Sequence, residues 1–438
     1  MRKSGGRRAR GEEGSEPGGV QRLYARDLAP GCDIGESALN SESDVVIVGS
    51  GPYALSLASH LRARGVEFRI FGPPMKFWRD MPKGINLKSF AFATSVYVPS
   101  EGHTYPEWCR SKGLEDFEPC TMASFAAYGM AMQARFVPEI ESVEVSRVSA
   151  SGEGRFDIAL ASGERARARR VVFATGLTHL ESMPEALCGL PPELVSHTAH
   201  LTDYTVFRDK DVAVLGAGAS AIEAGAMVHE NGGRAQIFVR EPAAIFHGKM
   251  DPNRSLYQRL RHPLSVIGPG MKNRVLQAAP LAVHFLPERR RLRFVKHYLG
   301  PAAPWWIKDR IDGLVPIMTR TAVHAAERWG DRVRLRLRQE ESDERTIEVD
   351  HVIAGTGYVP NVDRLAYLDE GIRTRLRRVE LGPALSMNFE SSLTGAYFLG
   401  PVAALSFGPL FRFVCGAEYA APALDLVLNQ NSQEFSLS

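Results

Sequence analysis

Two segments of this chain each carry a short apolar run, a glycine-rich turn and a helical repeat of apolar residues. The first runs from Asp44 to Gly65 (DVVIVGSGPYALSLASHLRARG) and the second from Asp211 to Gly233 (DVAVLGAGASAIEAGAMVHENGG). An unbroken apolar run before the turn is typical of a strand buried in a parallel sheet. A further apolar run follows each helical repeat. The pattern predicts two β-α-β units, and hence an α/β fold with two Rossmann-like dinucleotide-binding domains.

The glycines of both turns have the spacing that a bound dinucleotide requires. In the first turn, Gly49 permits the tight bend and Gly51 lets a pyrophosphate approach the backbone. Ala54 is small enough for the helix to pack on the strand. The pyrophosphate then lies at the helix N-terminus, where free N–H groups and the helix dipole favour an anion. The second turn repeats this set with Gly216, Gly218 and Ala221.

The residues after the second strand of each unit predict which dinucleotides bind. An acidic residue usually holds a ribose hydroxyl there, but the first unit reads Phe71-Gly72-Pro73-Pro74. The second unit ends in Arg240, which suits the 2′-phosphate of NADPH rather than NADH. Glu241 is adjacent and would reverse this preference if the register moved by one residue. Two such sites in one chain predict a held FAD and an exchanging NADPH.

The 438 residues are too many for one ordinary domain. We expect a disordered tail over 1–43, an FAD-binding domain over 44–200 and 350–428, and an NADPH-binding domain over 205–349. Within the last, a helical insert is expected over about 245–330. It contains Trp305 and Trp306, which suit core packing or a substrate pocket.

Composition and charge exclude several classes of function. The net charge is only +3, from 53 basic and 50 acidic residues, so little drives the chain toward nucleic acid or an anionic membrane. The N-terminal residues have no apolar signal region, and no apolar run is long enough to span a bilayer. The five cysteines contain no C-x-x-C pair, which argues against a zinc ribbon or a dithiol redox centre. We expect a cytoplasmic protein with no nucleic-acid or membrane partner; a homo-oligomer stays open.

Several segments together resemble the class B flavin-dependent monooxygenases, and most closely the microbial N-hydroxylase-like branch. They are GSGPYA at the first turn, FWRDMPKGINLKS (77–89), SHTAH (196–200), GAGASA at the second turn, AGTGYVPN (354–361) and SFGPLFRFVCGAEYAA (406–421). The resemblance covers about residues 44–428. Gly355 stands where those enzymes have alanine.

The resemblance implies an NADPH- and O2-dependent FAD monooxygenase of secondary metabolism that acts on a small molecule. Oxygen would be transferred by a C4a-hydroperoxyflavin, most readily to a nitrogen atom. It places FAD contacts on Gly49, Gly51, Ala54, Trp78, Lys88, Ser89, Thr175, Gly176 and Pro409, with Lys88 as the catalytic residue. It places NADPH contacts on Gly216, Gly218, Ser220, Ala221 and Arg240, and a further cofactor contact on Tyr358. His197 and His200 lack the acidic partners of a metal site, so no metal is expected.

Departures from the family pattern leave alternatives open. Baeyer–Villiger enzymes carry Phe-x-Gly before the histidine, where this chain has Glu193-Leu194-Val195. Amino-acid N-hydroxylases hold the substrate carboxylate with a lysine after the flavin loop. The corresponding stretch here, residues 90–99, has no lysine, which argues against ornithine or lysine as the substrate. Baeyer–Villiger or carbon hydroxylation, and a non-oxygenating NADPH-flavin oxidoreductase or sensor, are the alternatives. A flavin disulfide reductase needs a cysteine pair, but Cys109 and Cys120 are eleven positions apart.

Overall fold

The computed structural model describes residues 42–436, except 116, 252 and 340–343. These residues lie in one compact unit, Asn40–Ser438. The tail expected over 1–43 lies outside the described residues except for its last two, Glu42 and Ser43. These two residues belong to the first strand, which therefore includes two residues before the apolar run.

The first sheet is built around the first glycine turn. Its central strands are parallel, with Ile47 paired to Ile70 on one side and to Val172 on the other. The order is β2-β1-β5-β4-β3, and β16 also pairs with β5. The strands are β1 (Glu42–Val48), β2 (Phe68–Phe71), β3 (Val145–Ser151), β4 (Arg155–Leu160), β5 (Arg165–Phe173) and β16 (Ala396–Phe398). Helix α1 (Pro52–Ala63) is closed by a glycine C-cap at Gly65, which has a φ of +73°. Gly65 N–H donates to the Arg62 carbonyl and Val66 N–H to the Leu61 carbonyl, both at 3.0 Å.

The second sheet is entirely parallel and is built around the second glycine turn. Its order is β6-β13-β7-β8-β9. The strands are β6 (Val195–His197), β7 (Asp211–Leu215), β8 (Arg234–Phe238), β9 (Ile317–Met318) and β13 (His351–Ala354). Helix α5 (Ala219–Glu230) follows β7 and buries eight successive residues, from Ala221 to Val228. Together with the first sheet, this confirms the expected α/β fold with two Rossmann-like units.

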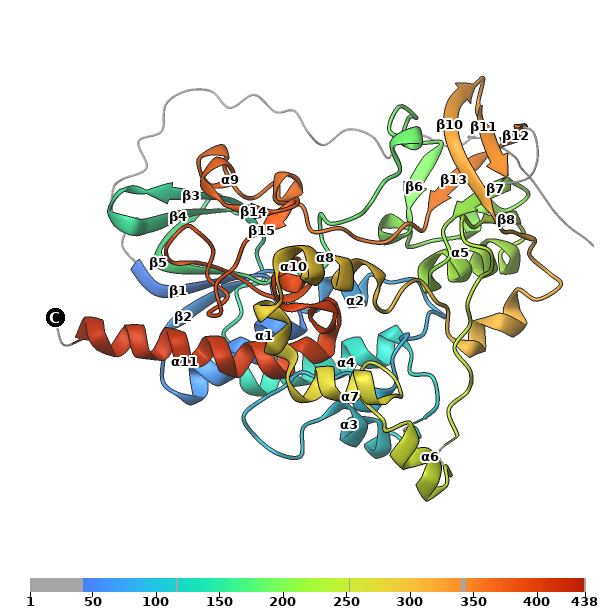
Figure 1. Cartoon of the computed structure of the whole chain (residues 1–438). Helices are drawn as coiled ribbons and strands as arrows, with labels where there is room; N and C mark the ends of the chain where they lie inside the picture. The colour runs from blue at the N-terminus through green and yellow to red at the C-terminus, as the bar shows by residue number, and fades with distance from the viewer. Residues whose placement is uncertain (1–41, 116, 252, 340–343, 437–438) are drawn as a thin grey trace, which may run out of the picture. The chain divides into compact units, whose positions relative to one another are not determined.

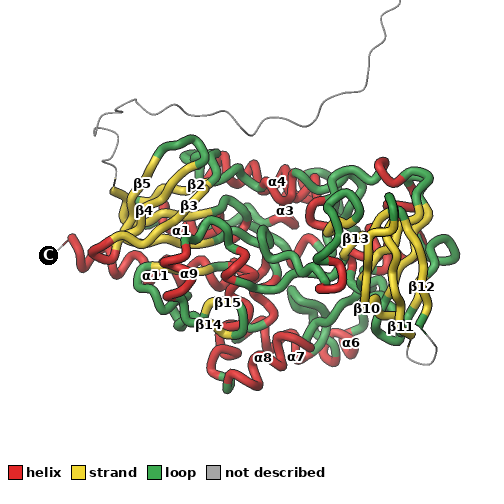
Figure 2. The backbone as a smooth tube through the Cα atoms, turned by 90° about the horizontal axis from the view of Figure 1, so that it is seen from above, coloured by secondary structure: helices red, strands yellow, loops and turns green. Residues whose placement is uncertain are grey.

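An antiparallel sheet follows in the chain, with β10 (Thr321–Trp329), β11 (Arg332–Gln339) and β12 (Arg345–Val349) side by side (Figure 2). Strand β11 buries Val333, Leu335 and Leu337 and exposes or half-exposes the arginines between them. The alternation therefore marks a half-buried strand, and its arginines pair with acids such as Glu348. A short hairpin, β14 (Arg378–Val379) with β15 (Gly382–Pro383), forms the last sheet.

Two expected boundaries differ from the structure. The helical part of the insert ends at Arg310, and residues 317–329 form β9 and β10 rather than helix. Strands β6 and β13 fall in the stretches assigned to the first domain, but both belong to the second sheet. A short apolar run predicts a buried strand without saying which sheet it joins, because the partner strand is chosen by tertiary packing.

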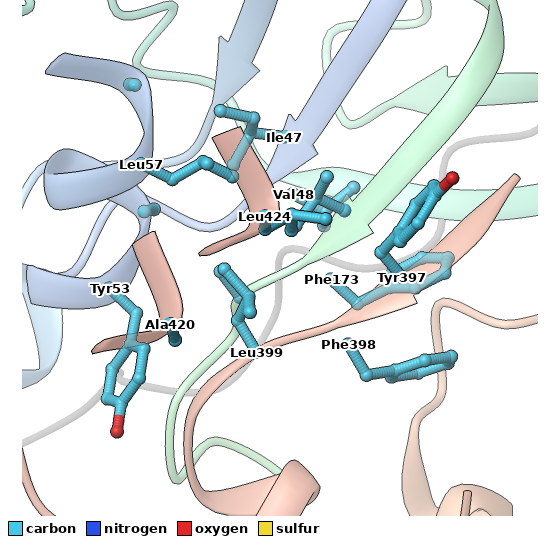
Figure 3. Packing of buried hydrophobic residues seen from close by; sticks show 14 of the residues in the cluster. Ile47, Val48, Tyr53, Leu57, Phe173, Tyr397, Phe398, Leu399, Ala420 and Leu424 are labelled. Carbon is cyan, nitrogen blue, oxygen red and sulfur yellow. The ribbon is translucent and has the colours of Figure 1, made fainter. Parts of the chain in front are cut away.

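Helices cover the sheets and fill the insert. The others are α2 (Lys76–Arg79), α3 (Tyr105–Ser111), α4 (Met122–Phe136), α6 (Leu256–Arg261), α7 (Met271–Ala278), α8 (Glu288–His297), α9 (Glu370–Arg375), α10 (Ala404–Phe407) and α11 (Ala417–Ser436). Helix α11 packs along α1 (Figure 1). Figure 3 shows this core, where Leu57 of α1 and Leu424 of α11 lie near Val48 of β1 and Leu399 after β16. None of the helices in the described part of the chain has the length and apolar character that a membrane crossing needs.

Candidate functional site

The first glycine turn, between β1 and α1, leaves its backbone open to a ligand. Gly49 has a φ of +108°, and a side chain there would bring its Cβ within 2.5 Å of the Ala174 carbonyl oxygen. Only glycine fits that contact. Gly51 caps α1 with φ −85° and ψ −171°, and a Cβ there would meet no atom within 4 Å. The turn therefore closes on β5 through Gly49 and presents an open backbone at Gly51, as an approaching pyrophosphate requires.

The second glycine turn repeats this geometry between β7 and α5. Gly216 has a φ of +134°, and its Cβ would lie 2.4 Å from the Gly355 carbonyl oxygen. Gly218 caps α5 with φ −85° and ψ 170°, close to the values at Gly51. The nearest atom to a Cβ at Gly218 is Pro301 Cβ of the insert, at 3.8 Å. The residues present thus fit a second dinucleotide, in a turn that the insert approaches.

The third residue of each glycine set is a buried alanine, as the packing role predicts. Ala54 and Ala221 are both fully buried. Ala221 explains the glycine at position 355, since a Cβ at Gly355 would lie 2.5 Å from Ala221 Cβ and 2.6 Å from its Cα. The departure from the family's alanine at this position follows from the close approach of α5 to the end of β13.

Trp78 lies on the short helix α2, just beyond the end of β2. Gly72 and Met75 turn the chain here with φ of +131° and +54°, and Met75 N–H donates to the Ser50 carbonyl in the first glycine turn at 3.1 Å. Trp78 is half-buried and meets Phe125 edge to face, with ring centroids 4.9 Å apart. It packs on the core beside the first turn.

Lys88 and Ser89 lie in the loop between α2 and α3. Ser89 is engaged locally, since its hydroxyl lies 2.5 Å from that of Thr94. The Lys88 side chain is exposed and makes no hydrogen bond or ion pair with any residue that the structure describes. Even so, its pKa is lowered, first by desolvation and then by the charge of Arg412. Lys88 is therefore accessible to solvent and yet has enough protein around it to disfavour its charged form.

Arg412 and His247 complete a group of basic side chains around Lys88. The pKa of His247 is lowered by desolvation and by the charge of Lys88, and the pKa of Arg412 is lowered by desolvation. Arg412 donates to the Tyr298 carbonyl at 2.7 Å rather than to a carboxylate. Lys88, His247 and Arg412 thus come from three separate chain segments. Among the causes of their pKa shifts there is no acidic neighbour that would offset the positive charge. Such a place favours an anion.

The remaining first-sheet candidates lie at strand ends and in the C-terminal segment. Thr175 follows β5, and its hydroxyl lies 3.0 Å from that of Tyr367, while Gly176 has a φ of +68°. Pro409 is buried and begins the 3-10 turn Pro409–Arg412. It follows Gly408, where a Cβ would lie 2.9 Å from Val283 Cγ1 of the insert. The insert thus packs directly on the C-terminal segment.

Tyr358 and His197 meet at the carboxyl end of the second sheet. Their rings lie edge to face with centroids 5.5 Å apart, and His197 pairs with Ala354 across β6 and β13. Burial raises the pKa of Tyr358 to about 12 and lowers the pKa of His197. Among the residues that the structure describes, no three His, Cys, Asp or Glu side chains are grouped so that they could hold a metal ion.

Arg240 and Ser220 are the exposed candidates of the second unit. Ser220 lies in the first turn of α5. Arg240 lies two residues beyond β8, and among the described residues it has no hydrogen-bond or ion-pair partner. Both side chains are therefore available to a ligand at the second glycine turn.

Tyr53 is a structural determinant of the first site that the sequence did not reveal. Its hydroxyl donates toward the carbonyls of Phe411 at 3.0 Å and Phe413 at 2.8 Å. A Cβ at Gly416 would lie 2.0 Å from the same hydroxyl. Tyr53 therefore fixes the C-terminal segment on the start of α1. Nothing in the glycine motif marks this residue, since its partners are 358 and 360 positions away.

One cavity lies between the insert and Phe117. It has a volume of about 540 Å³ and is lined by Phe117, Asp251, Arg254, Arg259, Pro263, Leu264 and Arg274. Three arginines against one aspartate make it basic. Another cavity, of about 400 Å³, lies between Phe246 and residues 308–317.

Two sheets with parallel central strands, each with a glycine turn at the carboxyl end of one of those strands, form a fold that suits two dinucleotides. The chain belongs to the pyridine nucleotide-disulphide oxidoreductase family, whose sequence model matches residues 43–409.

Solved flavin monooxygenases share this fold. An ornithine N-hydroxylase from Kutzneria sp. 744 has a TM-score of 0.69 at 16% identity and covers 90% of this chain and 100% of that one. The ornithine hydroxylase from Pseudomonas aeruginosa has a TM-score of 0.70 at 17% identity, covering 89% and 99%. A bacillithiol disulfide reductase from Staphylococcus aureus has a TM-score of 0.59 at 15% identity, covering 90% and 99%. The expected likeness to N-hydroxylating monooxygenases is confirmed for the fold.

Curated relatives match part of the chain. A FAD-dependent urate hydroxylase from Xanthomonas campestris pv. campestris is 26% identical over 215 residues, which is 46% of this chain and 46% of the relative. Pentalenolactone D synthase from Streptomyces exfoliatus is 27% identical over 247 residues, or 51% and 40%. The matches span less than half the length of either relative.

Proposed function

We propose that the protein is an NADPH- and O2-dependent FAD monooxygenase that inserts one oxygen atom into a small molecule, at a nitrogen atom. The observation that carries this proposal is the pair of glycine turns with nearly equal cap geometry, one closed by Gly49 on β5 and one by Gly216 on β13. FAD would bind at the first turn and NADPH at the second. Bound FAD would supply the hydride-accepting and oxygen-activating chemistry.

The chain's own residues bind, orient and exclude water in this proposal. The open backbone at Gly51 and the N–H groups of α1 hold the FAD pyrophosphate. Arg240 holds the 2′-phosphate of NADPH. Tyr53 keeps the C-terminal segment on α1, so that Pro409 and its neighbours close the flavin site against water.

Lys88 is our candidate catalytic residue, touching the flavin or the substrate. This role is supported by the exposure of Lys88 and by its lowered pKa, which reflects the surrounding protein and the charge of Arg412. Lys88→Met should lower the yield of oxygenated product while flavin content stays normal. Lys83→Met is the matched control, because Lys83 is an exposed lysine in the same loop. Equal yields from both variants would remove Lys88 from the machinery.

Nitrogen is favoured as the oxygen acceptor because the structural neighbours include an ornithine N-hydroxylase and a monooxygenase that acts on the amine cadaverine. The partial relatives include a urate hydroxylase, so carbon hydroxylation is the second candidate, with Baeyer–Villiger oxidation beside it. The cytoplasmic location, the role in secondary metabolism and a homo-oligomeric state stay predictions of the sequence.

The deciding experiment follows NADPH oxidation with a panel of amines, purines and aromatic acids under isotope-labelled O2. We expect NADPH use to rise with a substrate and one labelled oxygen atom to appear in the product. Fragmentation of the product ion then assigns the oxygen to nitrogen or carbon. NADPH oxidation that yields peroxide but no labelled product from any compound would favour a non-oxygenating flavin oxidoreductase instead.

A further inference from the structure

Cys109 and Cys120 are eleven positions apart in the sequence and lie next to each other in the fold. Cys109 lies in α3 and Cys120 lies just before α4. Their Sγ atoms are 3.8 Å apart, and both side chains are buried. The eleven-residue spacing argued against a thiol pair, but the loop between them turns back and brings the two sulfurs together.

This thiol pair lies directly beside the loop that carries Lys88. The Cys120 carbonyl accepts the Leu87 N–H at 2.7 Å, and Met122 N–H donates to the Ile85 carbonyl at 3.0 Å. An antiparallel bridge between Asn86 and Thr121 lies between these bonds. A displacement of Cys120 therefore acts on the backbone immediately before Lys88.

We propose that Cys109 and Cys120 are a peroxide-oxidisable pair that forms an intramolecular disulfide. One sulfur attacks a peroxide oxygen, the O–O bond breaks, and a sulfenic acid and one water form. The second sulfur then attacks the first, releasing the sulfenic oxygen as a second water. Overall, two thiols and one H2O2 give one disulfide and two waters. Each sulfur loses one electron to the peroxide, and both thiol protons leave in water.

The geometry requires only a local movement. A disulfide has an S–S distance of about 2.05 Å, so the sulfurs must approach by less than about 2 Å. Among the residues between the two cysteines, those from Ser111 to Glu115 are exposed, so this segment can open without unpacking the sheet. Leu114 N–H and Lys112 N–H both bond to the Cys109 carbonyl, which ties this exposed turn to α3.

The other described cysteines offer built-in comparisons. Cys415 is buried, and desolvation raises its pKa to about 12, so it is a poor nucleophile. Cys188 is exposed, and its Sγ lies 3.5 Å from the Pro184 carbonyl oxygen. Neither contacts another described thiol. Cys32 lies outside the described residues.

Thiol mapping on the full-length FAD-loaded protein tests the proposal without any substitution. The protein is treated with H2O2, quenched in acid, alkylated under denaturing conditions and digested. We expect two of its five thiols to be lost. The peptides carrying Cys109 and Cys120 should be linked and lighter by two hydrogen atoms, and dithiothreitol should reverse this. Full alkylation of both residues, or linkage of either to Cys32 or Cys188, would overturn the proposal.

Variants then test whether the pair acts on the Lys88 loop. Peroxide should slow NADPH oxidation several-fold in the parent protein and in Cys188→Ser, with recovery on reduction. Cys109→Ser should resist this loss. The coupling is wrong if the mapped disulfide forms while the rate is unchanged. This readout rests on the proposed function, whereas the thiol mapping does not, so the two failures are distinguishable.

Discussion

The two glycine turns begin their helices in the same way but are closed by different parts of the chain. Gly51 and Gly218 have φ of −85° in both caps. At the first turn, Tyr53 and α11 attach the C-terminal segment to α1. At the second, α5 packs against insert residues such as Ala303 and Ile307. The first turn is thus held by the C-terminal segment, which is distant in sequence, whereas the second is packed by the insert that follows it in the chain.

The comparison suggests how one fold serves a held and an exchanging cofactor. The first turn suits a held FAD, because the hydrogen bonds of Tyr53 fix the C-terminal segment beside the start of α1. The second turn has exposed Ser220 and Arg240 at its ligand side, which suits a dinucleotide that comes and goes.

The largest effect is expected at the ends of β13 and β5. Gly355→Ala would press its Cβ to 2.6 Å from the Ala221 backbone, and such overpacking costs about 3 kcal/mol. The equivalent Ala174→Gly only removes a methyl group and should cost about 1 kcal/mol. Denaturant unfolding measures both free energies. Equal losses would show that α5 approaches its strand no more closely than α1 does.

A pH-dependent loss of stability is expected in the second sheet. His351 is buried and neutral, with Nδ1 donating to the Glu193 carbonyl and Nε2 accepting from Ser196. Desolvation lowers its pKa to about 4. Because the unfolded chain binds the proton more readily, stability is full above about pH 6.5 and falls toward pH 4, by up to about 3 kcal/mol. His351→Asn should flatten this slope, whereas His229→Asn on α5 should leave it in place.

Cofactor choice should change with Arg240. Arg240→Ala should lower the preference for NADPH over NADH by about ten- to a hundredfold, since a charge-assisted bond to the 2′-phosphate is lost. Arg234→Ala, at the other end of β8 and paired with Asp211, is the control. Steady-state kinetics with both cofactors measures the ratio. An unchanged ratio in Arg240→Ala would mean that another residue reads the phosphate.

The smallest effect is expected at the start of the first strand. Glu42 pairs with Arg155 at 2.9 Å and with Arg169 at 3.2 Å, and all three side chains are partly exposed. Glu42→Gln should cost less than about 1 kcal/mol and should matter less at high salt. A loss of several kcal/mol would show that these residues are part of the domain's core rather than its edge.

The sequence predicted the local parts of this molecule well. The glycine spacing, the apolar runs and the helical repeats identified both turns and their flanking elements, because these are set by neighbouring residues. It did not predict that β6 and β13 join the second sheet, that Tyr53 binds the C-terminal segment, or that Cys109 meets Cys120. Each of these depends on contacts between distant residues, which periodicity and spacing do not encode. Gly355 is an intermediate case. The sequence shows that glycine replaces the family's alanine at this position, but only the structure shows the reason, which is the close approach of Ala221.

The most direct test of the two-cofactor account uses one methyl group in each turn. Gly51→Ala and Gly218→Ala place a Cβ where the structure has room, so both proteins should fold normally. Purified Gly51→Ala should lose bound FAD, while Gly218→Ala should keep its FAD and bind NADPH more weakly. Flavin content by absorbance after denaturation, with NADPH titration of each variant, measures both. Full flavin content in Gly51→Ala, or loss of flavin in Gly218→Ala, would contradict the assignment of the turns.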